Sequence, residues 1–157
     1  MPRRNRPQRR QIAPDAVYAD PQVAKFINRL MQRGKKSVAE RIFYDALERL
    51  DGKANEAPLE IFRKALGKAK PLVRVKARRV GGSTYQVPME VREEEGVAIG
   101  SRWLIEYAKK RNGKSMAERL SAELLETYLG STSATMKKRD EVHRMAEANK
   151  AFAHYRF

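Results

Sequence analysis

The chain contains no cysteine, and no stretch of it approaches the length of an apolar membrane span. Without cysteine it can form neither a disulfide framework nor a thiolate metal site, which suits a reducing cytosol. A spanning helix needs about 20 consecutive apolar residues. The charged N-terminal residues are not followed by an apolar segment, so we expect no signal peptide. These absences argue against disulfide-rich secreted proteins and membrane-spanning proteins.

Acidic side chains are scarce relative to basic ones. The 157 residues include 34 Lys and Arg but only 19 Asp and Glu, which gives a formal net charge of +15. The excess positive charges repel one another and destabilise a compact chain. We therefore expect a polyanionic partner. The candidates are nucleic acid and an anionic membrane surface. The membrane is disfavoured because residue 2 is proline and no cysteine offers a lipidation site.

The first eleven residues are predicted to be a flexible basic arm. They contain two prolines and no carboxylate, and they cannot contribute to a core. Residues 12–157 have the length of a single domain, which we expect to be helical and to end in a basic, aromatic tail. The arm's candidate nucleic-acid-binding residues are Arg3, Arg4, Arg6, Arg9 and Arg10.

Apolar residues recur with the helical period in six segments. Asp20 and Pro21 mark the start of the first helix, and two pairs, Ser37 with Glu40 and Ser115 with Glu118, have the spacing of a capping box. The aromatic residues Phe26, Trp103 and Tyr107 lie on helical apolar stripes and are expected in the core. The six segments cover approximately residues 21–34, 37–51, 58–69, 97–112, 115–130 and 135–150.

Between the third and fourth segments the period changes to two, which predicts a β-hairpin at about residues 72–91. Apolar and basic residues alternate on its first strand, a glycine pair followed by Ser83 supplies the turn, and Pro88 suits an edge strand. The predicted fold is therefore mainly α, a helical body of about six helices with one protruding β-hairpin. The alternating basic residues of the first strand are Arg74, Lys76 and Arg78.

The hairpin lies within a stretch without acidic residues, from 61 to 89, that contains eight basic residues. Alternate residues of a strand share one face at a spacing of about 7 Å, close to that of successive phosphates. A solvated outer face is the plainer interpretation, but adjacent cations without anionic neighbours repel each other, so nucleic-acid contact is favoured. Arg79 belongs to the same basic stretch.

Further cations are candidates for phosphate contact. Lys35 and Lys36 follow Gly34 in a tight turn. Lys137, Lys138 and Arg139 are expected in the first turn of the last helix, where cations oppose the helix dipole without a visible local benefit. The aromatic tail, residues 154–157, either stacks on bases or docks on the protein body, and the sequence leaves both open.

No enzymatic motif is found, and no cofactor, metal or catalytic residue is predicted. The GKS at residues 113–115 resembles the end of a phosphate-binding loop, but the glycine required at position 108 is alanine. The two histidines lack metal-ligand spacing. Two other classes remain as alternatives: a DNA-binding helical module, and an RNA-processing enzyme using Asp45 or Glu48, which are more simply solvated charges.

Several short motifs are spread across nearly the whole chain: KFIN (25–28), GKK (34–36), AERI (39–42), RRVGG (78–82), YQVPMEV (85–91), RWL (102–104), KKR (137–139) and MAEANKAFAHYR (145–156). Together they resemble the motifs of the bacterial small-subunit ribosomal protein seven family. The resemblance implies a helical body with a hairpin, direct binding to the 3′ major domain of small-subunit rRNA, and nucleation of head assembly.

The same resemblance implies a location in the cytoplasmic ribosome, beside the exit-site tRNA and the mRNA path. It also implies contact with small-subunit protein eleven and, in some members, repression of the protein's own mRNA. Carried onto this sequence, rRNA contacts fall on the arm and on the other cations named above, with Arg102 added. The acidic run at residues 93–95 departs from a family stretch that is often basic or polar.

Overall fold

The computed structural model describes residues 11–130 and 133–155. These residues form mainly helices with one antiparallel hairpin, which confirms the predicted fold class. The chain divides into two compact units, Met1–Glu40 and Arg41–Phe157. The division falls inside the second helix. The arm arginines, residues 3–10, lie outside the described part of the chain.

The first unit contains α1, Pro21–Leu30, and the beginning of α2, Lys36–Glu48. The start of α1 is the predicted one: Pro21 is its first residue, and the Asp20 carboxylate accepts a hydrogen bond from the backbone N–H of Gln22 at 2.7 Å. Phe26 is fully buried on its apolar face, as predicted. The capping box at Ser37 is wrong, because α2 begins one residue earlier and Ser37 lies inside it.

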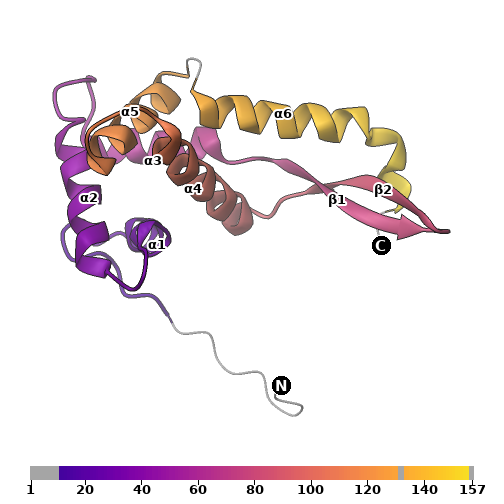
Figure 1. Ribbon diagram of the computed structural model, residues 1–157, viewed down its shortest axis with the longest axis horizontal. Helices are drawn as coiled ribbons and strands as arrows, with labels where there is room; N and C mark the ends of the chain where they lie inside the picture. The colour runs from indigo at the N-terminus through magenta and orange to yellow at the C-terminus, as the bar shows by residue number, and fades with distance from the viewer. Residues whose placement is uncertain (1–10, 131–132, 156–157) are drawn as a thin grey trace, which may run out of the picture. The chain divides into compact units, whose positions relative to one another are not determined.

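The second unit contains the remaining helices and the hairpin. Helices α3, α4 and α5 pack on one another, and α6 runs alongside the hairpin (Figure 1). The rings of Phe43 and Phe62 meet edge to face at 5.1 Å within the core. The elements are α3 Pro58–Ala69, β1 Val73–Val80, β2 Ser83–Glu90, α4 Glu93–Lys110, α5 Met116–Leu129, α6 Ala134–Ala148 and the short 3-10 helix η1 Lys150–Tyr155.

The hairpin turns on two glycines. Gly81 and Gly82 both have positive φ, 57° and 88°, as a two-residue hairpin turn with the twist of its strands requires. The register runs from Val73 opposite Glu90 to Val80 opposite Ser83, so Ser83 opens β2 rather than belonging to the turn. The hairpin extends away from the cluster of α3, α4 and α5 (Figure 1).

Two aromatic residues expected in the core are only partly buried. Trp103 and Tyr107 have intermediate exposure, and Trp103 lines a surface pocket. Fully buried aliphatic residues of the same helix, Leu104 among them, face the core instead. The buried face of α4 therefore runs through Leu104 and Ala108, and Trp103 and Tyr107 lie at its margin.

Candidate nucleic-acid interface

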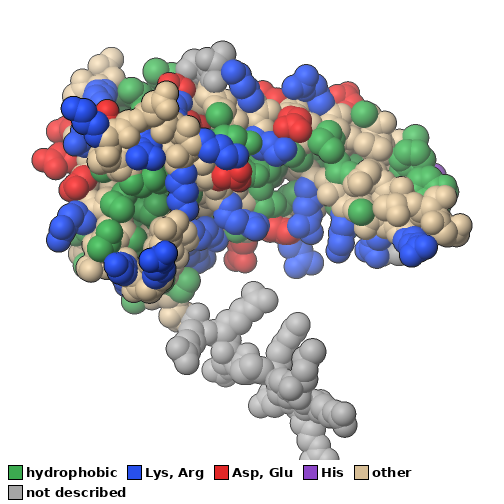
Figure 2. All heavy atoms as spheres, in the orientation of Figure 1, with side chains coloured by type: hydrophobic (Ala, Val, Ile, Leu, Met, Phe, Trp, Pro, Cys, Tyr) green, Lys and Arg blue, Asp and Glu red, His purple; other side chains and the backbone are tan. Residues whose placement is uncertain are grey.

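The basic residues of β1 share one face of the hairpin. In antiparallel pairing, residues directly opposite each other lie on the same face. Because side chains alternate along a strand, Arg74, Lys76 and Arg78 lie on one face as predicted, and Arg79 lies on the other face. Figure 2 shows Lys and Arg side chains in a row along the edge of the hairpin away from α6. The cross-strand partners of the three are Met89, Val87 and Tyr85.

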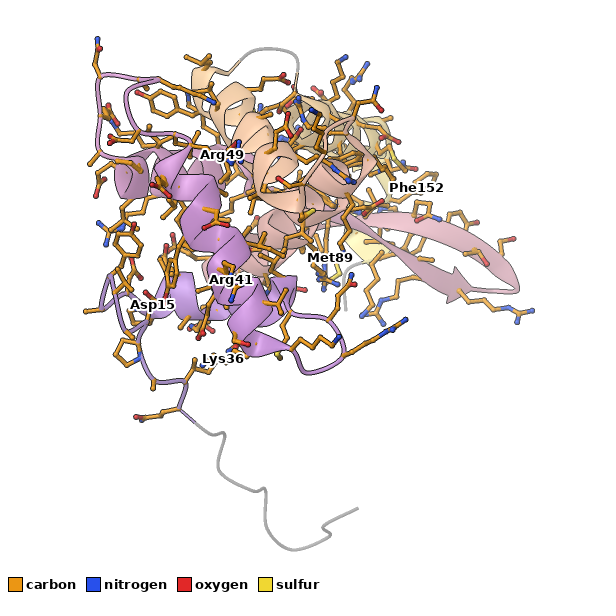
Figure 3. The ribbon with its side chains drawn as sticks, turned by 60° about the vertical axis from the view of Figure 1, so that its left-hand side comes forward. Asp15, Lys36, Arg41, Arg49, Met89 and Phe152 are labelled. Carbon is orange, nitrogen blue, oxygen red and sulfur yellow. The ribbon has the colours of Figure 1, made fainter. Side chains whose placement is uncertain are left out.

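The described part of the C-terminal tail docks on the hairpin at Tyr85, which lies opposite Arg78, so the tail occupies part of the face that carries the basic row. The Tyr85 ring lies 5.1 Å from the Phe152 ring and 5.2 Å from the Tyr155 ring. The ring of His154, which is exposed, lies 4.0 Å from that of Tyr155. In Figure 3 the labels Met89 and Phe152 mark β2 and η1, which pack against each other. Docking on the protein is thus the arrangement of the tail up to residue 155.

Acidic residues at the start of α4 neutralise cations at the root of the hairpin. Arg74 forms an ion pair with Glu95. Lys70 lies between α3 and the hairpin. Its Nζ is 2.8 Å from a carboxylate oxygen of Glu93. The hydrogen bond from Lys70 lowers the pKa of the Glu93 carboxyl below its usual value. Glu93 and Glu95 therefore face protein cations.

The cations of α6 are partly engaged within the protein. Because α6 begins at Ala134, capped by Ser133, the basic triplet lies later than the predicted first-turn position. Lys138 pairs with Glu141 at 3.0 Å, and Arg139 donates to the carbonyl of Lys68 at 2.9 Å. The expectation of no local benefit is therefore wrong for these two residues.

One pocket joins α6 to the hairpin root. It has a volume of about 210 Å³, and its lining includes Arg74 and Val75 of β1, Trp103 of α4 and Lys138 of α6. Lys138 and Arg74 thus border the same concavity. Lys137 is exposed on α6, and Arg102 is exposed on α4.

A buried carboxylate fixes the start of α6 to α5. Glu123 is fully buried and accepts hydrogen bonds from the backbone N–H and the hydroxyl of Thr135 at 3.1 and 2.6 Å. Its other oxygen accepts from Arg111 Nε at 2.5 Å. Arg111 also holds Glu126, whose pKa is lowered by that hydrogen bond. This network sets the direction in which α6, with its cations, leaves α5.

Lys35 and Lys36 belong to the first unit, where both are exposed. Their turn is tight because Arg33 and Gly34 both adopt positive φ, 53° and 73°. The Lys36 ammonium lies 3.6 Å from the Glu40 carboxylate, one helical turn along α2 (Figure 3). Such an exposed pair contributes little and leaves the ammonium accessible to a phosphate.

Lys70 was not among the predicted site residues, although it lies at the hairpin root. Its position within the acid-free stretch was the available signal. Within residues 11–130 and 133–155 no group of three or more metal-ligating side chains is placed to hold a metal ion. No helix in that same part of the chain is long and apolar enough to span a bilayer.

A helical scaffold that carries a cationic hairpin, with basic residues bordering it on α6, defines a class of protein that contacts a structured polyanion. A family model described as ribosomal protein S7p/S5e matches residues 2–150. The small ribosomal subunit protein uS7 of Polynucleobacter necessarius is 59% identical over the full length of both chains. That of Ralstonia pickettii is 59% identical and that of Hahella chejuensis 57%, also over both full lengths.

The chain belongs to the ribosomal protein S7p/S5e family, as its motifs predicted. It is therefore a structural protein of the ribosome and not an enzyme, and its localisation is the cytoplasmic ribosome. The enzymatic alternative built on Asp45 or Glu48 is thereby set aside.

Proposed function

We propose that this protein binds the 3′ major domain of small-subunit rRNA directly and nucleates assembly of the subunit head. The relatives named above are small-subunit proteins, and the family resemblance stated from the motifs implies this role. The observation that carries the proposal is the single-faced row of Arg74, Lys76 and Arg78 on the hairpin. Such a row follows a phosphate backbone and gains affinity by releasing condensed counterions.

The mechanism is fixed positioning of charge. The apolar core and the Glu123 network hold α6, while η1 supports β2, so the cations of α6 and of the hairpin are ordered before RNA arrives. Preorganised cations suit RNA whose folded shape presents phosphates at matching positions, and specificity then comes from shape more than from base reading. The proposed contacts are the arm residues Arg3, Arg4, Arg6, Arg9 and Arg10, with Lys35, Lys36, Arg74, Lys76, Arg78, Arg79, Arg102, Lys137, Lys138 and Arg139.

The proposal extends to the neighbours of the bound protein. The hairpin side is proposed to lie near the exit-site tRNA and the mRNA path, and the protein is proposed to contact small-subunit protein eleven. Binding of its own mRNA, as a repressor, is a further part of the same proposal. The resemblance supports these partners, and enzymatic footprinting of assembled subunits with and without the protein tests them.

The decisive experiment is a filter-binding salt series with a 3′ major domain fragment. Charge neutralisation of Arg74, Lys76 and Arg78 to glutamine should weaken binding, and it should flatten the log–log salt dependence by about 0.7 to 0.9 for each lost phosphate contact. A matched control neutralises Lys53, Lys109 and Lys114, which are exposed and belong neither to the hairpin nor to α6. The proposal fails if both triple variants show the same slope, or if duplex DNA competes as well as the fragment.

A further inference from the structure

The hairpin root has acidic partners that no RNA-binding role requires. Glu93, Glu94 and Glu95 form the first turn of α4, where their charges are favourable to the helix dipole. Two of them reach across to cations that precede or begin the hairpin, Lys70 and Arg74. Glu94 is exposed and has no ion-pair partner among the described residues. Of the three glutamates, Glu93 and Glu95 therefore neutralise cations within the described part of the protein and Glu94 does not.

Two glycines bring this turn close to the hairpin root. A Cβ at Gly100 would lie 3.2 Å from the backbone of Ala69, and one at Gly96 would lie 2.7 Å from the Lys70 side chain. A larger residue at Gly100 would require α4 or the backbone at the end of α3 to shift. The close approach places the carboxylates of Glu93 and Glu95 within ion-pair reach of Lys70 and Arg74.

The Arg74–Glu95 pair leaves the guanidinium incompletely satisfied. Arg74 Nε is buried and has no hydrogen-bond partner within the described residues. Both side chains remain more than a third exposed, at 37% and 39%, so the pair is open to solvent and to a competing anion. A phosphate offers several acceptor oxygens, so it can compete with the Glu95 carboxylate for this guanidinium.

We propose that Glu95, supported by Glu93, is an internal competitor for RNA phosphate at the hairpin root, so that it lowers the affinity of the free protein for unstructured polyanions. A flexible RNA gains little at Arg74, because it must first displace a carboxylate that is already in place. A folded RNA that also engages Lys76 displaces the Glu95 carboxylate at a free-energy cost that is small compared with its total binding free energy. Glu95 is thus a specificity-determining residue. The inference rests on the proposed RNA-binding function.

The test compares Glu95→Gln with Glu94→Gln, which removes the same charge from the same helical turn without breaking an ion pair. The probes are polyuridylate and the 3′ major domain fragment, each measured across a salt series. The affinity for polyuridylate of the Glu95→Gln variant should be about three-fold higher than that of the Glu94→Gln variant. Glu95→Gln should also steepen the salt slope by about 0.7, the value for one added single-strand phosphate contact. The preference for the folded fragment should fall accordingly.

A double-mutant cycle assigns the effect to the pair. In an Arg74→Gln background the gain from Glu95→Gln should disappear, because no cation remains to be released. Equal gains from the two glutamate variants, a gain that survives in the Arg74→Gln background, or weaker binding by Glu95→Gln would each overturn the inference. Circular dichroism verifies that each variant is folded. If the unmodified protein bound no RNA, the proposed function itself would fail, which is a different outcome.

Discussion

A single buried carboxylate, Glu123, is expected to stabilise the second unit more than any exposed charge. Replacing it with glutamine puts an amide nitrogen opposite one of its donors, Arg111 or Thr135, and removes the buried negative charge. Breaking one partner of a buried pair is costly, so we expect a loss of about 2 to 3 kcal/mol in the free energy of unfolding. Urea denaturation followed by circular dichroism measures it.

Glu126→Gln is the matched control, because Glu126 binds the same arginine from a side chain that is 41% exposed. Exposed pairs contribute little, so its loss should stay below about 1 kcal/mol. Equal losses in the two variants would mean that burial of Glu123 is not what makes it important.

At the scale of elements, a histidine joins α6 to the start of the hairpin. The backbone N–H of Leu72 donates to His143 Nε2 at 3.1 Å, which requires the neutral ring with its proton on Nδ1. Burial, and secondarily the cation of Arg139, lowers the pKa of His143 below 6.5, while Asp140 opposes the shift. The other charged groups lining the adjoining pocket are Glu90, Glu147 and Lys150.

Acidification should therefore loosen the junction between α6 and the hairpin. The unfolded chain takes up a proton near pH 6.5, before the folded protein does, so stability is present above that pH. It is lost as the pH falls toward the lower folded pKa. Denaturation at about pH 7.5 and about pH 5.5 should show a larger drop for the unmodified protein than for His143→Gln. His154→Gln, at the exposed histidine, should keep the full drop; if it removes the drop, the assignment to His143 is wrong.

Local signals in the sequence predicted the elements well, and contacts between distant residues were what they missed. Ser115 was assigned correctly because its hydroxyl accepts the N–H of Glu118 within one turn. Ser37 has the same local signature, yet the turn at Arg33 and Gly34 starts α2 earlier. The pairing of Arg74 with Glu95 depends on how α4 approaches α3, which no local pattern encodes.

In the candidate site, too, local patterns were predicted correctly and contacts between distant residues were missed. Alternation along β1 was enough to place its basic residues on one face, since side-chain direction in a strand is a local property. Arg139 shows the limit: its hydrogen bond to the Lys68 carbonyl joins positions 71 residues apart. Charge counts from sequence therefore overstate how many cations are free to meet RNA.

At the scale of the whole molecule, the net positive charge is divided between the arm and the folded units. Five of the fifteen net positive charges belong to the arginines of residues 1–10. Removing those residues should reduce affinity for the 3′ major domain fragment, and the salt slope should fall by about 0.7 to 0.9 for each arginine that contacts a phosphate. The melting temperature should stay unchanged, because the arm has no aromatic or branched apolar side chain to pack.

A full-length variant with the five arm arginines changed to glutamine shows whether RNA binding depends on the charge of the arm or on its length. If phosphate contact is the arm's contribution, this variant and the truncated protein should have the same salt slope, since both lack the same cations. A lower melting temperature in either protein would show that the arm supports the fold instead. A slope equal to that of the unmodified protein would mean that the arginines do not contact RNA, and that the hairpin and α6 cations account for the electrostatic part of binding.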